Sequence, residues 1–226
     1  MMAGFVEKSV EWFRLLVFEK ISKAIKPGAV KGLMDPAFAI VEKFAYEFSV
    51  FTERYLSIYK PIIDGELSLL DSIEMKKVLV IGSGSLPATA ILFARFSDAS
   101  VLGIDIDEKA VFRANRLVER MGFSQSKLKF VQGDGLCVDL SGFDVVLLLY
   151  GIRSQMKMLE CASTGLDDDA VVLVRAVCEN SLVRIDSECV DLSKWFDVIG
   201  QVHSTALGPI DSFLLKKKSS GLEGEL

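Results

Sequence analysis

The sequence is poor in the residues from which metal centres and disulfide frameworks are built. It has a single histidine, His203, and four cysteines that lie far apart, at positions 137, 161, 178 and 189, with no C-x-x-C pair among them. A zinc site needs several convergent ligands, and a disulfide scaffold is typical of a short secreted chain rich in cysteine. We therefore expect no metal site, and a reducing compartment, the cytoplasm, as the location of the protein.

The sequence also lacks an excess of positive charge and a long uncharged apolar run. Lysine and arginine together number 26 against 31 acidic residues, so the formal net charge is −5 and no basic patch for a nucleic-acid backbone is present. The apolar stretch of residues 1–26 is interrupted by charges of both signs, which is not typical of a signal peptide or of a spanning helix. We expect a small-molecule substrate, with no nucleic-acid partner and no membrane association.

The apolar pattern divides the chain into two regions and a tail. Apolar residues recur at three- and four-residue spacing from residue 3 to about 74, with breaks expected near "KPGAVKG" (26–32) and "YKPIIDG" (59–65). We expect a helical region at 1–74, an α/β domain at 75–218 and a flexible polar tail at 219–226.

The second region alternates short β-branched runs with helical stretches, which indicates a parallel sheet with crossover helices. The seven runs are "KKVLVIG", "ASVLGID", "KLKFVQG", "FDVVLLLYG", "AVVLVRAV", "FDVIGQVH" and "DSFLLKKK". The loop "STALGP" between the last two is too short for a crossover helix, so we expect these two strands to pair antiparallel.

A glycine turn, Gly82-Ser83-Gly84, follows the first predicted strand. Because glycine has no Cβ, backbone can approach a ligand closely there, and the free N–H groups of the next helix face the same place. Pro87 and Ala88 occupy the region of the third glycine in the dinucleotide fingerprint, which argues against a standard NAD site.

Polar residues follow the next three predicted strands. Asp105 ends the second strand, 21 positions past Gly84, where a carboxylate reaches a ribose diol. Asp107 is better placed to cap the following helix, which leaves Asp105 free to bind the ribose. Asp134, in "QGDG", either caps a turn or accepts a hydrogen bond from an adenine amino group, and we expect Tyr150 to point toward the same edge of the sheet.

These features together resemble the class I S-adenosylmethionine-dependent transferases, over about residues 76–218. The resemblance implies a Rossmann-like α/β fold with seven strands, six parallel and one antiparallel, next to an N-terminal helical annex. It also implies S-adenosyl-L-methionine as the cofactor, consumed as a substrate. The implied cofactor-binding residues are Gly82, Ser83, Gly84, Leu86, Pro87, Asp105, Ile106, Asp134, Gly135 and Tyr150.

A narrower resemblance is to the nicotianamine synthases, and among them to the short archaeal proteins. "IGSGSLPATAILFA" resembles their signature "GSGPLPLTS", "GIDIDEKAVFRANRL" resembles their second-strand segment, and "GPIDSFLLKKK" resembles their closing strand. "YKPIIDGELSLL" is similar to their "NYxxLxxxExxLL", which carries Tyr59 and Glu66 onto family positions. "LVRAVCENSLVRI" stands where the family has a strand that ends near an arginine and is followed by a helix.

The narrower resemblance implies transfer of the aminocarboxypropyl arm of the cofactor to an amine, with release of methylthioadenosine. Glu66 and Tyr59 are the catalytic candidates, as acceptors of the amine proton, and Arg175, at the end of the fifth strand, would hold a substrate carboxylate. The residues alone leave other interpretations open, because Glu66 could be an exposed helix residue, Tyr59 a packing residue and Arg175 part of a surface ion pair.

Two other functions remain open at this point. A small-molecule methyltransferase on the same fold would release S-adenosylhomocysteine, and a non-catalytic cofactor-binding protein would release neither nucleoside. Aromatic residues at helical spacing, Phe48, Phe51 and Tyr55, could also pair two copies of the chain into a homodimer.

Overall fold

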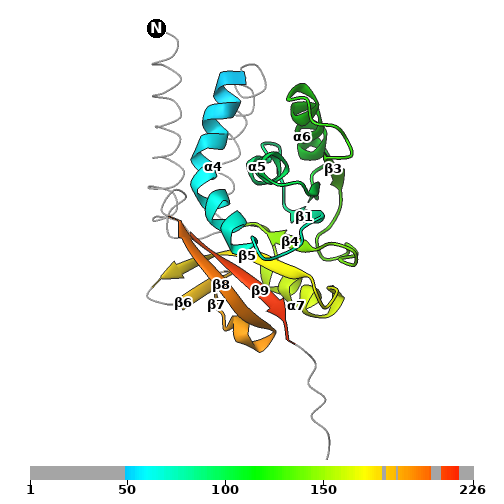
Figure 1. Cartoon of the computed structure of the whole chain (residues 1–226). Coiled ribbons are helices and arrows are strands. Elements are labelled where there is room, and N and C mark those ends of the chain that lie inside the picture. Colours follow the sequence, from blue (N-terminus) through cyan, green and yellow to red (C-terminus); the bar gives the residue numbers. More distant parts are fainter. Residues whose placement is uncertain (1–48, 180–181, 187, 205–209, 219–226) are drawn as a thin grey trace, which may run out of the picture.

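The structure is a computed structural model that describes residues 49–179, 182–186, 188–204 and 210–218 (Figure 1). The predicted tail at 219–226, the expected break near residues 26–32 and most of the predicted N-terminal helical region lie outside these residues. The helices and strands are, in order, α4 (Ser49–Leu69), β1 (Lys77–Ile81), α5 (Ala88–Phe96), β2 (Ser100–Asp105), α6 (Glu108–Arg120), β3 (Leu128–Gln132), β4 (Val145–Leu148), α7 (Gln155–Gly165), β5 (Val171–Glu179), β6 (Leu182–Ile185), β7 (Glu188–Cys189), the 3-10 turn η2 (Leu192–Lys194), β8 (Phe196–Ser204) and β9 (Ile210–Lys217).

The sheet has the predicted strand directions. Strands β3, β2, β1, β4 and β5 lie side by side in that order and run parallel. β9 pairs antiparallel with β5, and β8 pairs antiparallel with β9, so β8 runs in the same direction as β5. The expected arrangement of six parallel strands and one antiparallel strand is confirmed, as is the Rossmann-like α/β class.

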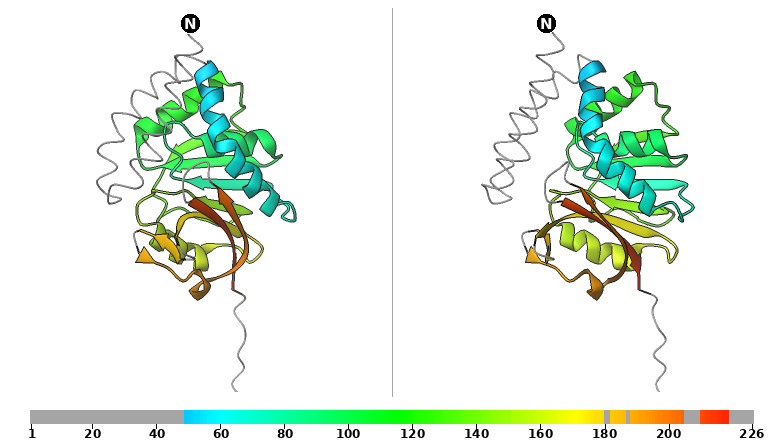
Figure 2. Two further views of the ribbon diagram at one scale, coloured as in Figure 1. Left: turned by 90° about the vertical axis from the view of Figure 1, so that its left-hand side faces the viewer. Right: turned by 60° about the vertical axis from the view of Figure 1, so that its left-hand side comes forward.

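Helices cover both faces of the sheet (Figures 1 and 2). Buried side chains of β1 alternate between two apolar clusters, since successive side chains of a strand point to opposite faces. Val78 and Val80 join the cluster that α4, α5 and α6 cover, whereas Leu79 and Ile81 join the cluster that α7 covers. This alternation fixes which strand residues can meet α4 and which can meet α7.

Two short strands, β6 and β7, extend the sheet beyond the prediction. β6 pairs antiparallel with the last part of β5, and β7 pairs with β6. The expectation of a helix after the fifth strand is wrong, because "LVRI" alternates exposed and more buried positions with the period of a strand. The Asp186 carboxylate at the tip of this hairpin accepts a hydrogen bond of 2.9 Å from the Met156 N–H, in the first turn of α7. A helical stretch is likewise not found between β3 and β4, where residues 133–144 form turns.

The helix α4 continues through the expected break at residues 59–65. Pro61 lies inside it and removes only one backbone donor, on a turn whose residues are largely exposed to water. Gly65, the other predicted breaker, allows a close approach, since a Cβ there would stand 2.6 Å from Cγ2 of Val202 in β8. The prediction was wrong because a glycine that permits helix–sheet contact has the same sequence signal as one that ends a helix.

Candidate functional site

The glycine turn joins β1 to α5 and is fastened to the end of β2. The N–H groups of Gly82 and Ser83 both donate to the Ile104 carbonyl, at 2.9 and 3.0 Å. Gly82 and Gly84 have φ of +77° and +67°, a backbone conformation that side chains disfavour. Local conformation therefore selects glycine at both positions, and the turn is held by β2 rather than by a ligand.

The two glycines differ in what surrounds them. A Cβ on Gly82 would lie 2.1 Å from Cγ2 of Ile152, whereas a Cβ on Gly84 would meet nothing within 4 Å. Gly82 is thus packed against the chain, and Gly84 faces open space directly before α5. Bare backbone with space beside it, just before a helix N-terminus, suits the close approach of a charged or polar ligand.

The carboxylate of Asp105 connects the glycine turn to the end of β2. Its Oδ2 accepts a hydrogen bond of 2.8 Å from the Gly84 N–H, and its Oδ1 accepts one of 3.0 Å from the Asp107 N–H. Asp107 caps α6 through the Lys109 N–H at 2.9 Å, as predicted. Each oxygen of Asp105 keeps one lone pair, which is what a ribose diol would need.

The remaining predicted cofactor residues lie around this edge of the sheet. Ile106 is 70% exposed beside Asp105. Asp134 caps a turn by accepting from the Leu136 N–H at 3.0 Å, which is the local role considered for it. A Cβ on Gly135 would stand 2.6 Å from Ile81, so glycine is required there by packing against β1.

Three further predicted residues occupy the loops after β1 and β4. Leu86 is partly buried against the cluster on the α4 side, and Pro87 stands immediately before α5, at its N-cap position. Tyr150 follows β4 and is about half exposed, and burial raises the pKa of its hydroxyl group. All three side chains therefore come from segments that leave the carboxyl ends of parallel strands, the usual place for ligands in such sheets.

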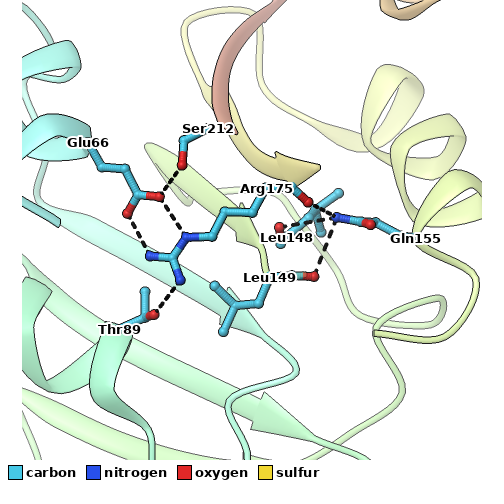
Figure 3. A network of polar contacts seen from close by, with 7 residues as sticks. All are labelled: Glu66, Thr89, Leu148, Leu149, Gln155, Arg175 and Ser212. Carbon is cyan, nitrogen blue, oxygen red and sulfur yellow. Dashed lines mark hydrogen bonds and ion pairs between the residues drawn. The ribbon is translucent and has the colours of Figure 1, made fainter. Parts of the chain in front are cut away.

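A buried polar network joins Glu66, Thr89, Arg175 and Ser212 (Figure 3). The Arg175 guanidinium donates from Nε to Oε1 of Glu66 at 2.7 Å and from Nη2 to Oε2 at 2.8 Å. Its Nη1 donates to the Thr89 hydroxyl at 2.9 Å, and the Ser212 hydroxyl donates to Oε1 of Glu66 at 2.5 Å. Side chains from α4, α5, β5 and β9 thus meet at one point.

Burial distinguishes this network from surface ion pairs. Glu66 is 0% exposed and Arg175 is 3% exposed, so the alternatives of an exposed helix residue and a surface ion pair are wrong. Burial lowers the pKa of the Arg175 guanidinium, but the charge and hydrogen bonds of Glu66 outweigh burial and raise that pKa above its ordinary value. Arg175 also lies within β5, not at its end, because the strand continues to Glu179.

Gln155 holds the strands that carry this network. From the start of α7 its Nε2 donates to the Arg175 carbonyl at 2.9 Å and lies 3.4 Å from the carbonyls of Leu148 and Leu149 (Figure 3). The end of β4 is thereby tied to β5. Sequence reasoning missed Gln155, Thr89 and Ser212, although a threonine just after the glycine turn and a serine within the apolar run "IDSFLL" were available as signals.

Tyr55 and Tyr59 form a pair on the inner side of α4. Their hydroxyl oxygens are 3.1 Å apart, and their ring centroids are 5.2 Å apart. Burial raises the pKa of Tyr59, and this effect exceeds the lowering by the Tyr55 hydrogen bond and by the Arg175 charge. Tyr59 is therefore a neutral phenol near pH 7. Tyr55 is buried within the chain, and the other residues considered for chain pairing, at positions 48 and 51, have side chains outside the described part.

The part of the chain that the structure describes lacks two further features. No group of three or more His, Cys, Asp and Glu side chains in this part of the chain is arranged to hold a metal ion. Of the helices that the structure describes, none combines the length and the apolar character needed to cross a bilayer.

Solved structures with the same fold include enzymes crystallised with S-adenosylmethionine or its product. A glutamate-to-glutamine variant of MtNAS, a nicotianamine synthase, in complex with S-adenosylmethionine matches with a TM-score of 0.67 and 18% identity, over 80% of this chain and 72% of that chain. MtNAS in complex with MTA and tNA matches with a TM-score of 0.64 and 17% identity, over 79% and 69% of the two chains. An RNA methyltransferase from Salinibacter ruber in complex with S-adenosyl-L-homocysteine matches with a TM-score of 0.56 and 22% identity, over 73% and 95%.

Sequence comparisons add nothing to these matches. No family profile matches the chain, and no curated protein sequence matches it. At 17–22% identity the structural matches establish the class I methyltransferase fold alone.

Proposed function

We propose that the protein is an S-adenosylmethionine-dependent transferase. The support is the carboxyl edge of β1 and β2, where open space at Gly84, two spare lone pairs on Asp105 and the N-terminus of α5 converge. In this proposal the glycine turn holds the methionine part of the cofactor and Asp105 the ribose. The adenine lies near Ile106, Asp134 and Gly135, and the fold is one in which neighbours bind this nucleoside.

The finer proposal is that the transferred group is the aminocarboxypropyl arm, as in nicotianamine synthases. The observation that carries it is the position of Glu66, a fully buried carboxylate on a helix outside the sheet. Through Arg175 it connects to Thr89, the second residue of α5, and so lies close to the glycine turn. A helix that places a carboxylate at this point can contact the amino-acid arm of the cofactor. This contact would add to those that the sheet itself provides.

The proposed reaction breaks one bond and forms another. A neutral amine attacks the γ-carbon of the arm, a C–N bond forms, and the C–S bond electrons pass to the sulfonium sulfur. The products are methylthioadenosine and an alkylated ammonium, which loses a proton. Placing the amine in line with the C–S bond is the protein's main contribution, since proximity and alignment lower such barriers most.

The buried network suits positioning and charge control. Three of the five N–H groups of Arg175 are used by Glu66 and Thr89, which leaves two for a substrate carboxylate. Oε1 of Glu66 already accepts two hydrogen bonds and Oε2 accepts one, so a single lone pair remains for an ammonium group. Tyr59, with its raised pKa, serves as a neutral hydroxyl beside the arm and not as a phenolate base.

Incubation of the purified protein with S-adenosylmethionine alone, followed by chromatography of the nucleosides, tests the proposal. Methylthioadenosine formed without an added acceptor is the expected result. S-adenosylhomocysteine formed with an added acceptor would instead identify a methyltransferase. Calorimetric binding without either product would identify a non-catalytic binding protein, and no binding heat with folded protein would overturn the cofactor assignment itself.

A further inference from the structure

Gln155 is a buried glutamine whose amide group bridges the ends of two strands. It is the first residue of α7 and is 3% exposed. The pairing of β4 with β5 ends at Leu148 and Val174, and the amide lies just beyond that pair (Figure 3). Its Nε2 donates to the Arg175 carbonyl at 2.9 Å, and the carbonyls of Leu148 and Leu149 are 3.4 Å away. The amide therefore occupies the carboxyl edge of the sheet.

The three carbonyl oxygens fix the orientation of the Gln155 amide. A carbonyl oxygen only accepts hydrogen bonds, so the NH₂ group must face the three carbonyls and Oε1 must point away from them. No described residue donates to Oε1. In the described part of the chain every side-chain nitrogen or oxygen that is shut off from water has a hydrogen-bond partner, so Oε1 is not shut off. Gln155 thus presents one acceptor atom to a ligand at this edge.

The amide lies beside the glycine turn. Leu148 pairs with Ile81, the residue directly before Gly82. The loop of residues 149–154, which leads from β4 to Gln155, also packs against the turn, since a Cβ on Gly82 would overlap Cγ2 of Ile152. Strand pairing and loop packing thus both bring the residues around the amide to the place proposed for the methionine part of the cofactor.

Donor and acceptor groups meet at Arg175. Its guanidinium turns toward Glu66 and keeps two N–H groups for a carboxylate, whereas its backbone carbonyl is bonded to Gln155. The Leu149 carbonyl beside the amide is a second acceptor. An α-amino acid group carries a carboxylate and an ammonium on one carbon, so it needs donors and acceptors next to each other. The contact between Gln155 and Arg175 brings the two kinds of group together.

The chemistry of the arm decides which of its groups can meet Oε1. The arm of S-adenosylmethionine has a carboxylate, two methylene groups, a sulfonium and an α-ammonium, and only the ammonium donates hydrogen bonds of the ordinary kind. A carboxylate would face the lone pairs of Oε1 and of the strand carbonyls, which is unfavourable. An ammonium gains a charge-assisted hydrogen bond at the same place.

We propose that Gln155 binds the α-ammonium group of the cofactor's amino-acid arm. The inference rests on the proposed function, which places this arm at the glycine turn. Oε1 accepts a hydrogen bond from the ammonium, and the bonds of the NH₂ group to β4 and β5 hold Oε1 in place before the ligand arrives. The single lone pair left on Glu66 is then available to the attacking amine of the acceptor. Gln155 selects an arm that keeps its amino group and takes no part in bond breaking.

Unreactive thioether nucleosides test the inference on the unaltered full chain. S-adenosylhomocysteine carries both charged groups, its carboxypropyl analogue lacks only the ammonium, and its aminopropyl analogue lacks only the carboxylate. Calorimetry should show that S-adenosylhomocysteine binds about ten- to a hundredfold more tightly than the carboxypropyl analogue, the value of a hydrogen bond to a charged group. Equal affinities for these two nucleosides would overturn the inference, and this comparison needs no variant to fold.

Gln155→Leu separates recognition of the ligand from support of the strands. The variant should reduce the preference for S-adenosylhomocysteine over the carboxypropyl analogue to nearly none. Its preference over the aminopropyl analogue should stay unchanged, because that ratio reports the carboxylate. A role limited to holding the Arg175 carbonyl would weaken all three nucleosides alike and keep both ratios, which would contradict the proposal. The matched control is Gln201→Leu, at an amide that donates to Asp211 at 2.6 Å, and it should change neither ratio.

Turnover distinguishes failure of this inference from failure of the proposed function. Gln155→Leu should raise the KM for S-adenosylmethionine about ten- to a hundredfold with little change in kcat, because the ammonium contact is the same before and during the reaction. Methylthioadenosine release with unchanged ligand preferences in the variant would remove the Gln155 assignment alone. A preference that depends on Gln155, without methylthioadenosine release, would remove only the aminocarboxypropyl proposal. No binding of any of the nucleosides to the folded chain would remove both.

Discussion

Both carboxylate oxygens of Glu66 accept hydrogen bonds from the guanidinium group of Arg175, which follows 109 positions later in the sequence. The first residue belongs to α4, which lies outside the sheet, and the second to the interior strand β5 (Figure 3). Neither is reached by water to any extent. Removal of one partner of such a pair leaves a buried uncompensated charge, whereas replacement of both by apolar residues is often neutral.

The first prediction concerns the structural role of Glu66 and its proposed role in the reaction. Glu66→Gln should lower the free energy of unfolding by about 3 kcal/mol or more, because Arg175 loses its counter-charge. It should also abolish turnover, while S-adenosylmethionine affinity stays nearly unchanged. Urea unfolding and calorimetry of the variant measure the two effects, and full turnover in Glu66→Gln would show that Glu66 has no part in the reaction.

The control for Glu66 replaces both members of the pair. Glu66→Leu combined with Arg175→Met should recover most of the lost stability, because no buried charge remains. Turnover should stay absent in this double variant. If activity returned together with stability, the pair would be structural only.

The second prediction compares two glycines in the same backbone conformation. Gly84 and Gly142 have φ of +67° and +72°, and a Cβ on either would meet nothing within 4 Å. Gly84→Ala and Gly142→Ala should each cost about 1 kcal/mol of stability from backbone strain. Only Gly84→Ala should also weaken S-adenosylmethionine binding in calorimetry, because its methyl group occupies the space that the ligand needs. Equal affinities in the two variants would place the cofactor elsewhere.

The third prediction separates Asp105 from Asp107. Asp105→Asn should weaken S-adenosylmethionine binding about ten- to a hundredfold, since a hydrogen bond to a charged group contributes about 1.5 to 3 kcal/mol. Asp107→Ala should cost about 1 kcal/mol of stability through loss of the α6 cap and should leave affinity unchanged. Calorimetry and thermal unfolding of both variants provide the comparison. The reverse pattern would assign cofactor binding to Asp107 and only a stabilising role to Asp105.

The fourth prediction is a pH dependence of stability from Tyr59. Burial raises the pKa of its phenol above the ordinary value of about 10, so the folded state holds this proton more tightly than the unfolded state. The contribution of the Tyr59 phenol to the free energy of unfolding is constant below about pH 10. It becomes destabilising as the pH rises through the raised pKa. Tyr59→Phe should therefore gain stability relative to the unaltered chain only above about pH 10, as urea unfolding at stepped pH would show.

Tyr150→Phe provides the comparison for Tyr59. Burial also raises the pKa of Tyr150, but its side chain is about half exposed and water screens the effect. The gain above pH 10 should be smaller than for Tyr59→Phe. Identical gains for the two variants would mean that burial does not determine the behaviour of Tyr59.

The parts of the fold that sequence predicts well are those with strong local signals. The β-branched runs, the glycine turn and the Asp107 cap depend on residues that are neighbours in sequence, and all three are found as predicted. The short loop between β8 and β9 predicted their antiparallel pairing for a geometric reason. These signals do not depend on the rest of the molecule.

The parts that sequence could not predict depend on contacts between distant segments. The interruption expected at Pro61 is absent because packing of α4 on the sheet favours a continuous helix. Glu66 and Arg175 lie 109 positions apart in the sequence, and their direct contact is a property of the assembled fold. The sequence gives no sign that His203 has a partner, since Asp211 becomes adjacent to it only when β8 and β9 pair. Burial and register, not residue type, decide such contacts.

The strand β9 is the last described strand of the chain, yet it lies between β5 and β8 in the interior of the sheet. A nascent polypeptide that ends at residue 209 would leave Val171–Val177 of β5 as an open edge, which invites aggregation. It would also lack the hydroxyl of Ser212 on Glu66 and the carboxylate behind His203. A premature stop codon before β9 should therefore leave neither arrangement, as limited proteolysis of the truncated chain would show.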